Sequence, residues 1–79
     1  MISEVIVMLI NQRKEKLTDE KKEINIKIKE LKVKIENAES ESDKKDLLNQ
    51  VKILYEEKNE IKSQIKDCDE KINYYENEF

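Results

Sequence analysis

Few residues of this 79-residue chain are of the types that carry out catalysis or bind metal ions. There is no histidine, and the single cysteine, Cys68, can form neither an internal disulfide nor a metal site by itself. Glu56, Glu57 and Glu60 are spaced like paired catalytic carboxylates, but two helices provide no closed cleft around them. Nucleotide binding would need glycines beside the phosphates, and the chain has none. We therefore expect no enzymatic activity, no cofactor and no metal.

Four residues, Cys68 and the lysines Lys14, Lys21 and Lys58, have both a chemical and a structural interpretation. The ammonium group of Lys14 could activate the thiol of Cys68, or Cys68 could simply fill a small space in the core. Lys14, Lys21 and Lys58 could face a ligand carboxylate, or extend to solvent and fix the register of two helices. The structural interpretation is favoured in both cases.

Charge is abundant and unevenly distributed along the chain. Charged residues make up 44%, compared with roughly a quarter in ordinary globular proteins, and the net charge is −3. Residues 11–34 carry nine basic and five acidic side chains, whereas residues 35–79 carry seven basic and thirteen acidic ones. The basic run could bind phosphates, but no aromatic residues alternate with it and the second half is acidic. Direct binding of nucleic acid is not expected.

The C-terminal part of the chain is rich in carboxylates. The acidic residues here are Asp67, Asp69, Glu70, Glu76 and Glu78. Such a run is usually a solvated face of a helix. Its alternative interpretation is a surface that imitates the phosphate backbone of DNA and binds the basic groove of a partner protein.

The elements that position these residues follow from a heptad pattern in each half of the chain. In the second half, ten residues follow one another in steps of four and three, and nine of them are apolar. They are Leu47, Val51, Leu54, Lys58, Ile61, Ile65, Cys68, Ile72, Tyr75 and Phe79. In the first half, the corresponding residues are Val7, Ile10, Lys14, Leu17, Lys21, Ile24, Ile28, Leu31, Ile35 and Ala38. This spacing is typical of the contact line, or seam, of a coiled coil.

A break in phase between the two seams indicates a turn rather than one continuous helix. The second seam is shifted by two residues relative to the first, which differs from the insertions of three or four residues that coiled coils accommodate. The shift falls in residues 37–43, where Ser40 or Ser42 could cap the second helix. Asn37 is expected to end the first helix in the left-handed conformation, since glycine is absent.

The fold expected is therefore all-α, a single antiparallel coiled-coil hairpin over residues 1–79. Helix 1 is expected over about 2–38, the turn over about 39–43 and helix 2 over about 44–78. Facing residues then have numbers that add up to 82, as in Ile28 with Leu54 and Ile10 with Ile72. A chain this short has little core of its own, so dimerisation into a four-helix bundle is expected.

The first ten residues are predominantly apolar, on every side of the predicted helix. One partner helix can cover only one side of such a helix, and the other sides need a second contact. The expected interface for a dimer or a partner consists of Ile2, Ile6, Leu9, Tyr74, Tyr75 and Phe79. A second copy of the chain is the favoured occupant, and a groove on another protein is the alternative.

The same apolar start resembles neither a signal peptide nor a membrane span. It lacks a basic leader and a small-residue cleavage site, and ten helical residues reach about 15 Å of the roughly 30 Å needed. A single cysteine fits a reducing compartment. We expect a cytoplasmic protein that does not contact a membrane.

In its usage of Lys, Glu, Ile and Asn and its heptads, the chain resembles the small coiled-coil host-takeover proteins of AT-rich Gram-positive phages. Some of those proteins bind a replication clamp or a CRISPR nuclease and block its DNA channel. The resemblance implies an inhibitor that acts by acidic mimicry of DNA or by steric occlusion. We therefore expect a non-catalytic protein-binding module that occludes a larger protein, and a protein that handles DNA is one candidate. The alternative is a structural subunit, such as a scaffold or virion component.

Overall fold

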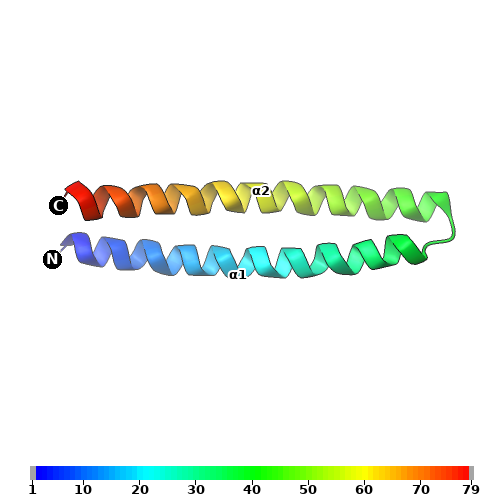
Figure 1. Ribbon diagram of the computed structural model, residues 1–79, viewed down its shortest axis with the longest axis horizontal. Coiled ribbons are helices and arrows are strands. Elements are labelled where there is room, and N and C mark those ends of the chain that lie inside the picture. Colours follow the sequence, from blue (N-terminus) through cyan, green and yellow to red (C-terminus); the bar gives the residue numbers. More distant parts are fainter. Residues whose placement is uncertain (1, 79) are drawn as a thin grey trace.

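The chain folds into two long helices that lie side by side and run in opposite directions (Figure 1). The computed structural model describes the backbone of residues 2–78 and the side chains of residues 2–77. Helix α1 covers Ile2–Asn37 and α2 covers Glu41–Glu78, with no strand between residues 2 and 78. The hairpin measures 60 × 14 × 12 Å, and both ends of the chain lie at the end away from the turn. The predicted all-helical hairpin is confirmed.

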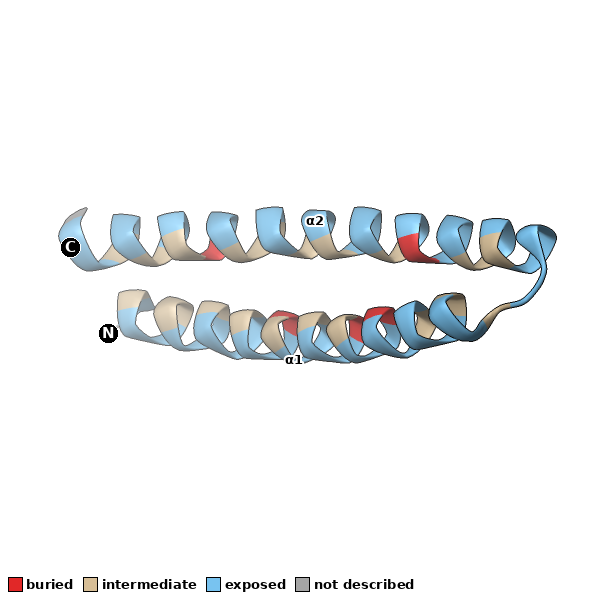
Figure 2. Ribbon diagram, turned by 45° about the vertical axis from the view of Figure 1, so that its right-hand side comes forward, coloured by how far each residue is buried: buried red, intermediate tan, exposed pale blue. Residues whose placement is uncertain are grey.

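The helices are long because nothing in the sequence interrupts them. Glycine and proline, the two strong helix breakers, are absent. Isolated helices are only marginally stable in water, so the pair depends on burying the apolar seam of each helix against the other. In Figure 2, the buried and half-buried residues accordingly follow the inner edge of each helix.

Burial along this inner edge matches the two heptad seams. The buried residues are Leu17, Ile24, Ile28, Val51 and Cys68, and all of them are predicted seam positions. Every other predicted seam residue from Val7 to Tyr75 is half-buried, including the three lysines. Phe79, the last residue of the predicted seam, lies outside the described residues.

The centre of the core lies in the half of the hairpin nearer the turn. Ile24, Ile28 and Val51 form a buried cluster, and Ile28 is the most buried of them at 4% exposed. Four half-buried residues surround this cluster: Leu31, Ile35, Leu54 and Ile61. No described side chain is completely buried. A hairpin of two helices therefore has a thin core that is open along both sides.

Residues 38–40 connect the helices, and Ser40 is the capping residue of α2. The Ser40 hydroxyl oxygen accepts a hydrogen bond from the amide of Asp43 at 3.4 Å. Its carbonyl oxygen accepts one from the amide of Lys44 at 3.1 Å. Ser42 lies within the first turn instead, because α2 begins at Glu41 rather than near residue 44.

The expected left-handed conformation of Asn37 is wrong. Asn37 is the last residue of α1, but no described residue has a positive φ angle. The amide of Ala38 donates to the carbonyl of Ile35 at 3.2 Å, a bond over three residues that tightens the last turn. The last turn of α1 is therefore tightened, and Asn37 does not need a left-handed conformation to end the helix.

Candidate interaction surfaces

Two of the three lysines in the seam extend to the same side of the hairpin. The Lys14 ammonium forms an ion pair with Asp69 at 2.5 Å, so its carboxylate partner belongs to the same chain. The Lys58 ammonium lies 5.8 Å from the centre of the Tyr55 ring. Asp69 and Tyr55 are two heptads apart on α2 and therefore lie along one line of that helix. Lys21 is half-buried in the seam.

Tyr55 lies between two ammonium groups, one from each helix. Lys32 of α1 reaches across the seam to within 5.6 Å of the centre of the ring, close to the distance from Lys58. A hydrogen bond from Lys32 and the positive charges of Lys32 and Lys58 lower the pKa of Tyr55 below its ordinary value. The contact between Lys32 and Tyr55 shows that these two residues lie on the same side of the hairpin. We call this side the tyrosine side.

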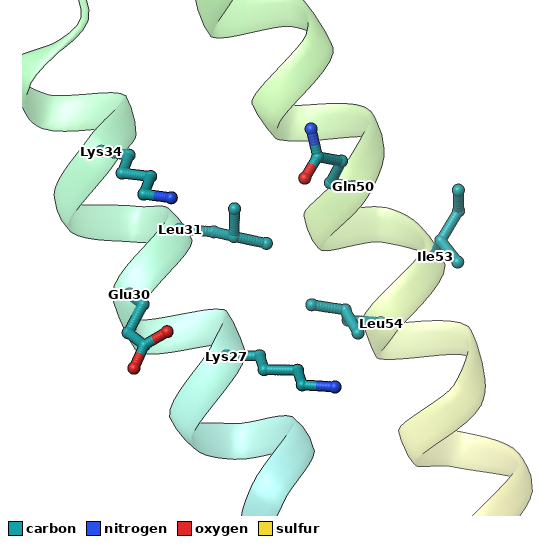
Figure 3. A pocket seen from close by; sticks show the side chains of 7 residues that line it. All are labelled: Lys27, Glu30, Leu31, Lys34, Gln50, Ile53 and Leu54. Carbon is teal, nitrogen blue, oxygen red and sulfur yellow. The ribbon is translucent and has the colours of Figure 1, made fainter.

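The opposite side of the hairpin carries shallow grooves between the helices, and we call it the groove side. The groove of Figure 3 has a volume of about 360 Å³. In that view Leu31 and Leu54 point towards each other from the two helices. The remaining lining residues are Lys27, Glu30, Lys34, Gln50 and Ile53. Only two helices line it, so it is too open to enclose a small ligand.

The next groove on this side contains the predicted carboxylates Glu57 and Glu60. They lie opposite Glu20 and Glu23 of α1, with Lys27 between the two grooves. Glu56 does not line it and is exposed. No group of acidic, cysteine or histidine side chains that could hold a metal ion is found within the described residues.

Cys68 occupies the core position that its spacing predicts. It is 5% exposed, and it contributes to a small groove near Arg13 and Asp67. The ammonium group of Lys14, which was considered as an activator of the Cys68 thiol, forms an ion pair with Asp69.

The acidic residues near the C-terminus do not share one side of the hairpin. Asp69 and Glu76 lie seven residues apart on the tyrosine side, and Asp69 is paired with Lys14. Asp67 lines a groove on the groove side, and Glu70 is exposed on the outer surface of α2 between the two sides. The side chain of Glu78 lies outside the described residues.

The end of the hairpin that carries the termini has the largest group of exposed apolar side chains. Five are more than half exposed: Ile2, Val5, Met8, Leu9 and Tyr74. Ile6 and Tyr75 are half-buried beside them, and the rings of Tyr74 and Tyr75 meet edge to face at 5.3 Å. We call these seven residues the apolar open end. Phe79, also predicted here, lies outside the described residues.

Seven exposed apolar residues of the described chain were not among the predicted interface residues: Val5, Met8, Ile26, Val33, Leu48, Ile53 and Tyr55. Val5 belongs to the apolar open end, whereas Leu48 and Ile53 lie on α2 near the turn and are each 55% exposed. Val5 has a clear signal in the sequence, because it lies between Ile2 and Leu9 on the outer surface of the same helix. Ile53 lines the groove of Figure 3 together with Leu31 and Leu54, whereas Leu48 is an exposed apolar residue of the kind common on protein surfaces.

Neither helix of the described chain contains an apolar stretch long enough to cross a membrane. Comparisons with protein-family models, with curated proteins and with solved structures find no match to this chain.

Proposed function

We propose that this chain is a non-catalytic protein-binding module whose contact surface is the apolar open end. One observation supports this proposal above the others: five apolar side chains are more than half exposed within a few turns of one another. Contiguous apolar patches of this kind on small proteins mark protein contacts, because burying them removes apolar surface from water.

The first occupant of this surface is a second copy of the chain. In a single hairpin, α2 covers only the seam side of the first turns of α1, and Ile2 remains 81% exposed. Two hairpins that pair through their open ends would bury Ile2, Leu9 and Tyr74 of each copy. Pairing would also enlarge the thin core of each hairpin, in which no described side chain is completely buried.

Docking of this module on a larger protein is the regulatory part of the proposal. The resemblance to phage inhibitor proteins suggests that the larger protein handles DNA and is occluded. The acidic residues offer weaker support than the apolar open end, because Asp67, Asp69 and Glu70 lie on different lines of α2. The other candidate is a structural subunit, which the same exposed surface supports if the chain forms assemblies larger than dimers.

A matched pair of leucine substitutions tests the proposal. Leu9 and Leu48 are both 55% exposed, but Leu9 lies at the apolar open end and Leu48 near the turn. Sedimentation equilibrium of the wild-type chain at micromolar concentrations is expected to show dimers. Leu9→Glu is expected to produce monomers, because it would place a charge in the buried contact. Leu48→Glu is expected to remain dimeric.

Two results would count against this proposal. A wild-type chain that is monomeric at high micromolar concentration would contradict pairing through the apolar open end. Equal loss of dimers in Leu9→Glu and Leu48→Glu would show that the open end has no special role. Assemblies much larger than dimers, abolished by Leu9→Glu, would favour the structural subunit over the regulator.

A further inference from the structure

The contact between Lys32 and Tyr55 identifies a line of lysines on the tyrosine side of the hairpin. Lys29 precedes Lys32 by three residues and Lys22 precedes Lys29 by seven, so all three share this side of α1. On α2, the lysines at positions 45, 52, 62 and 66 stand three, seven, ten or eleven residues from Tyr55 and lie along the same side. We call these seven residues the lysine strip: Lys22, Lys29, Lys32, Lys45, Lys52, Lys62 and Lys66.

On the tyrosine side, no acidic residue lies between Lys22 and Lys32 of α1 or between Lys45 and Lys66 of α2. Eight acidic residues occur in the same two segments, 16–35 and 45–66, and five of them line grooves on the groove side. These five are Glu20, Glu23, Glu30, Glu57 and Glu60. Asp46 is seven residues before Ile53 of the groove side, and Asp19 and Glu56 lie on the outer surfaces of the helices. Positive charge thus collects on one side and carboxylates on the others.

All seven lysines are exposed, and within the described residues none of them forms an ion pair with a carboxylate. The ion pairs of this part of the chain join Lys14 with Asp69 and Lys44 with Glu41, and neither involves the strip. Lys58 adds an eighth ammonium group beside Tyr55. Acidic residues reappear on this side at Glu15 and Asp69 towards the open end and at Glu36 and Glu39 towards the turn, where Glu36 lies at the level of Lys45.

The spacing of these charges fits the backbone of a double-stranded nucleic acid. From Lys45 to Lys66 the strip extends about 32 Å at 1.5 Å per residue, close to one turn of duplex DNA. Lysines are point charges that bind phosphates, whereas reading of bases would favour arginine or amide side chains aimed into a groove. Tyr55 offers no free ring for stacking on unpaired bases, because ammonium groups from Lys32 and Lys58 already lie near it.

Other occupants match the strip less well. A membrane surface would require a continuous apolar band beside the lysines, whereas the exposed apolar residues near the strip are scattered: Leu48 and Tyr55 within it, and Ile26 and Val33 on the adjoining outer surface of α1. The acidic groove side of a second copy has basic residues of its own, Arg13, Lys16, Lys27, Lys34 and Lys71, which offset its carboxylates. We infer that the lysine strip binds the phosphate backbone of double-stranded nucleic acid without sequence preference, a function separate from the apolar open end.

The test uses the full chain and a fluorescent 20-base-pair DNA duplex, with binding followed by fluorescence anisotropy at increasing salt. Binding is expected to weaken steeply, with a slope of log K against log salt of about −4 to −6 if five to seven lysines neutralise phosphates. Replacing Lys29, Lys52 and Lys62 with Gln should weaken binding by roughly tenfold or more at low salt. It should also make the slope shallower by about 3, because each lysine that no longer neutralises a phosphate reduces the slope by about 1.

A matched control removes the same charge from the other side. Replacing Lys16, Lys27 and Lys34 with Gln also removes three exposed lysines, and it should leave both affinity and slope nearly unchanged. Helix content measured by circular dichroism confirms that both variants fold. Equal weakening in the two variants would overturn the inference, as would failure of the wild-type chain to bind the duplex at low salt. Salt-sensitive self-association without DNA binding would assign the strip to the carboxylates of a second copy instead. The Leu9→Glu variant retains the lysine strip, so measuring its binding to the same duplex separates DNA binding from dimer formation.

Discussion

Tyr55 shows how a side chain at the surface can be controlled by residues distant in sequence. Lys58 is on the same helix, but Lys32 comes from the other helix, and both place positive charge near the ring. These charges favour the tyrosinate form, which lowers the pKa of Tyr55. Because the pKa is lower in the folded chain, ionised Tyr55 favours folding only in alkaline solution, near and above the ordinary value of about 10. At neutral pH its titration contributes no pH dependence to the free energy of unfolding.

Replacing Lys32 with Gln is expected to raise the pKa of Tyr55 towards its ordinary value, since the largest favourable influence is removed. The measurement is the absorbance of tyrosinate against pH, in a background where Tyr74 and Tyr75 are Phe. Lys34→Gln is the control, because Lys34 lines a groove on the other side of the hairpin. An unchanged titration midpoint in Lys32→Gln would show that the two helices do not adjoin at Tyr55.

Some single residues were predictable and others were not. The burial of Cys68 was predictable from its heptad position, because in a two-helix hairpin the residues of the seam are the ones that the other helix covers. The choice between Ser40 and Ser42 as the cap was not predictable, since either spacing could start a helix. The end of α1 at Asn37 was predicted with the wrong conformation, because a bond from Ala38 to Ile35 tightens the turn instead.

The two helices are held together along a single seam. The same substitution should therefore lower the free energy of unfolding much more at a seam position than on the outer side of the same helix. Ile28 is 4% exposed in the core, and Ile26, two residues earlier, is 56% exposed. Ile28→Ala should lower the free energy of unfolding by about 2–4 kcal/mol, through reduced apolar burial and the cavity left behind. Ile26→Ala should lower it by less than about 1 kcal/mol.

Urea denaturation followed by circular dichroism measures both variants. If Ile28→Ala is too unstable to give a folded baseline, Ile28→Val provides a smaller loss of about 0.5–1.5 kcal/mol. Similar losses for the Ile26 and Ile28 variants would mean that α1 turns a different side towards α2.

For the whole molecule, the net charge of each helix does not show on which side of the hairpin its charged residues lie. The sequence suggested a basic first helix and an acidic second one, and therefore argued against nucleic acid. Helical geometry instead divides the charges by side, since residues seven apart align and residues two apart do not. Lys45, Lys52, Lys62 and Lys66 of the acidic half thus join the lysines of the basic half. This arrangement requires both the turn and the register of the seams.

The apolar open end and the lysine strip both exist only if the chain forms the antiparallel hairpin, so its register is the central claim. The direct measurement places cysteines at Ile28 and Leu54, with Cys68 replaced by Ala, and oxidises the protein at high dilution. Ile28 lies in the buried cluster against which Leu54 packs, and the register of the two seams places these residues opposite each other. The hairpin predicts a disulfide within each chain, seen as a monomer of increased mobility on a non-reducing gel. A control with cysteines at Ile26 and Leu54 should remain reduced, because Ile26 faces outwards. Disulfides formed only between chains, or equally in both variants, would contradict the hairpin.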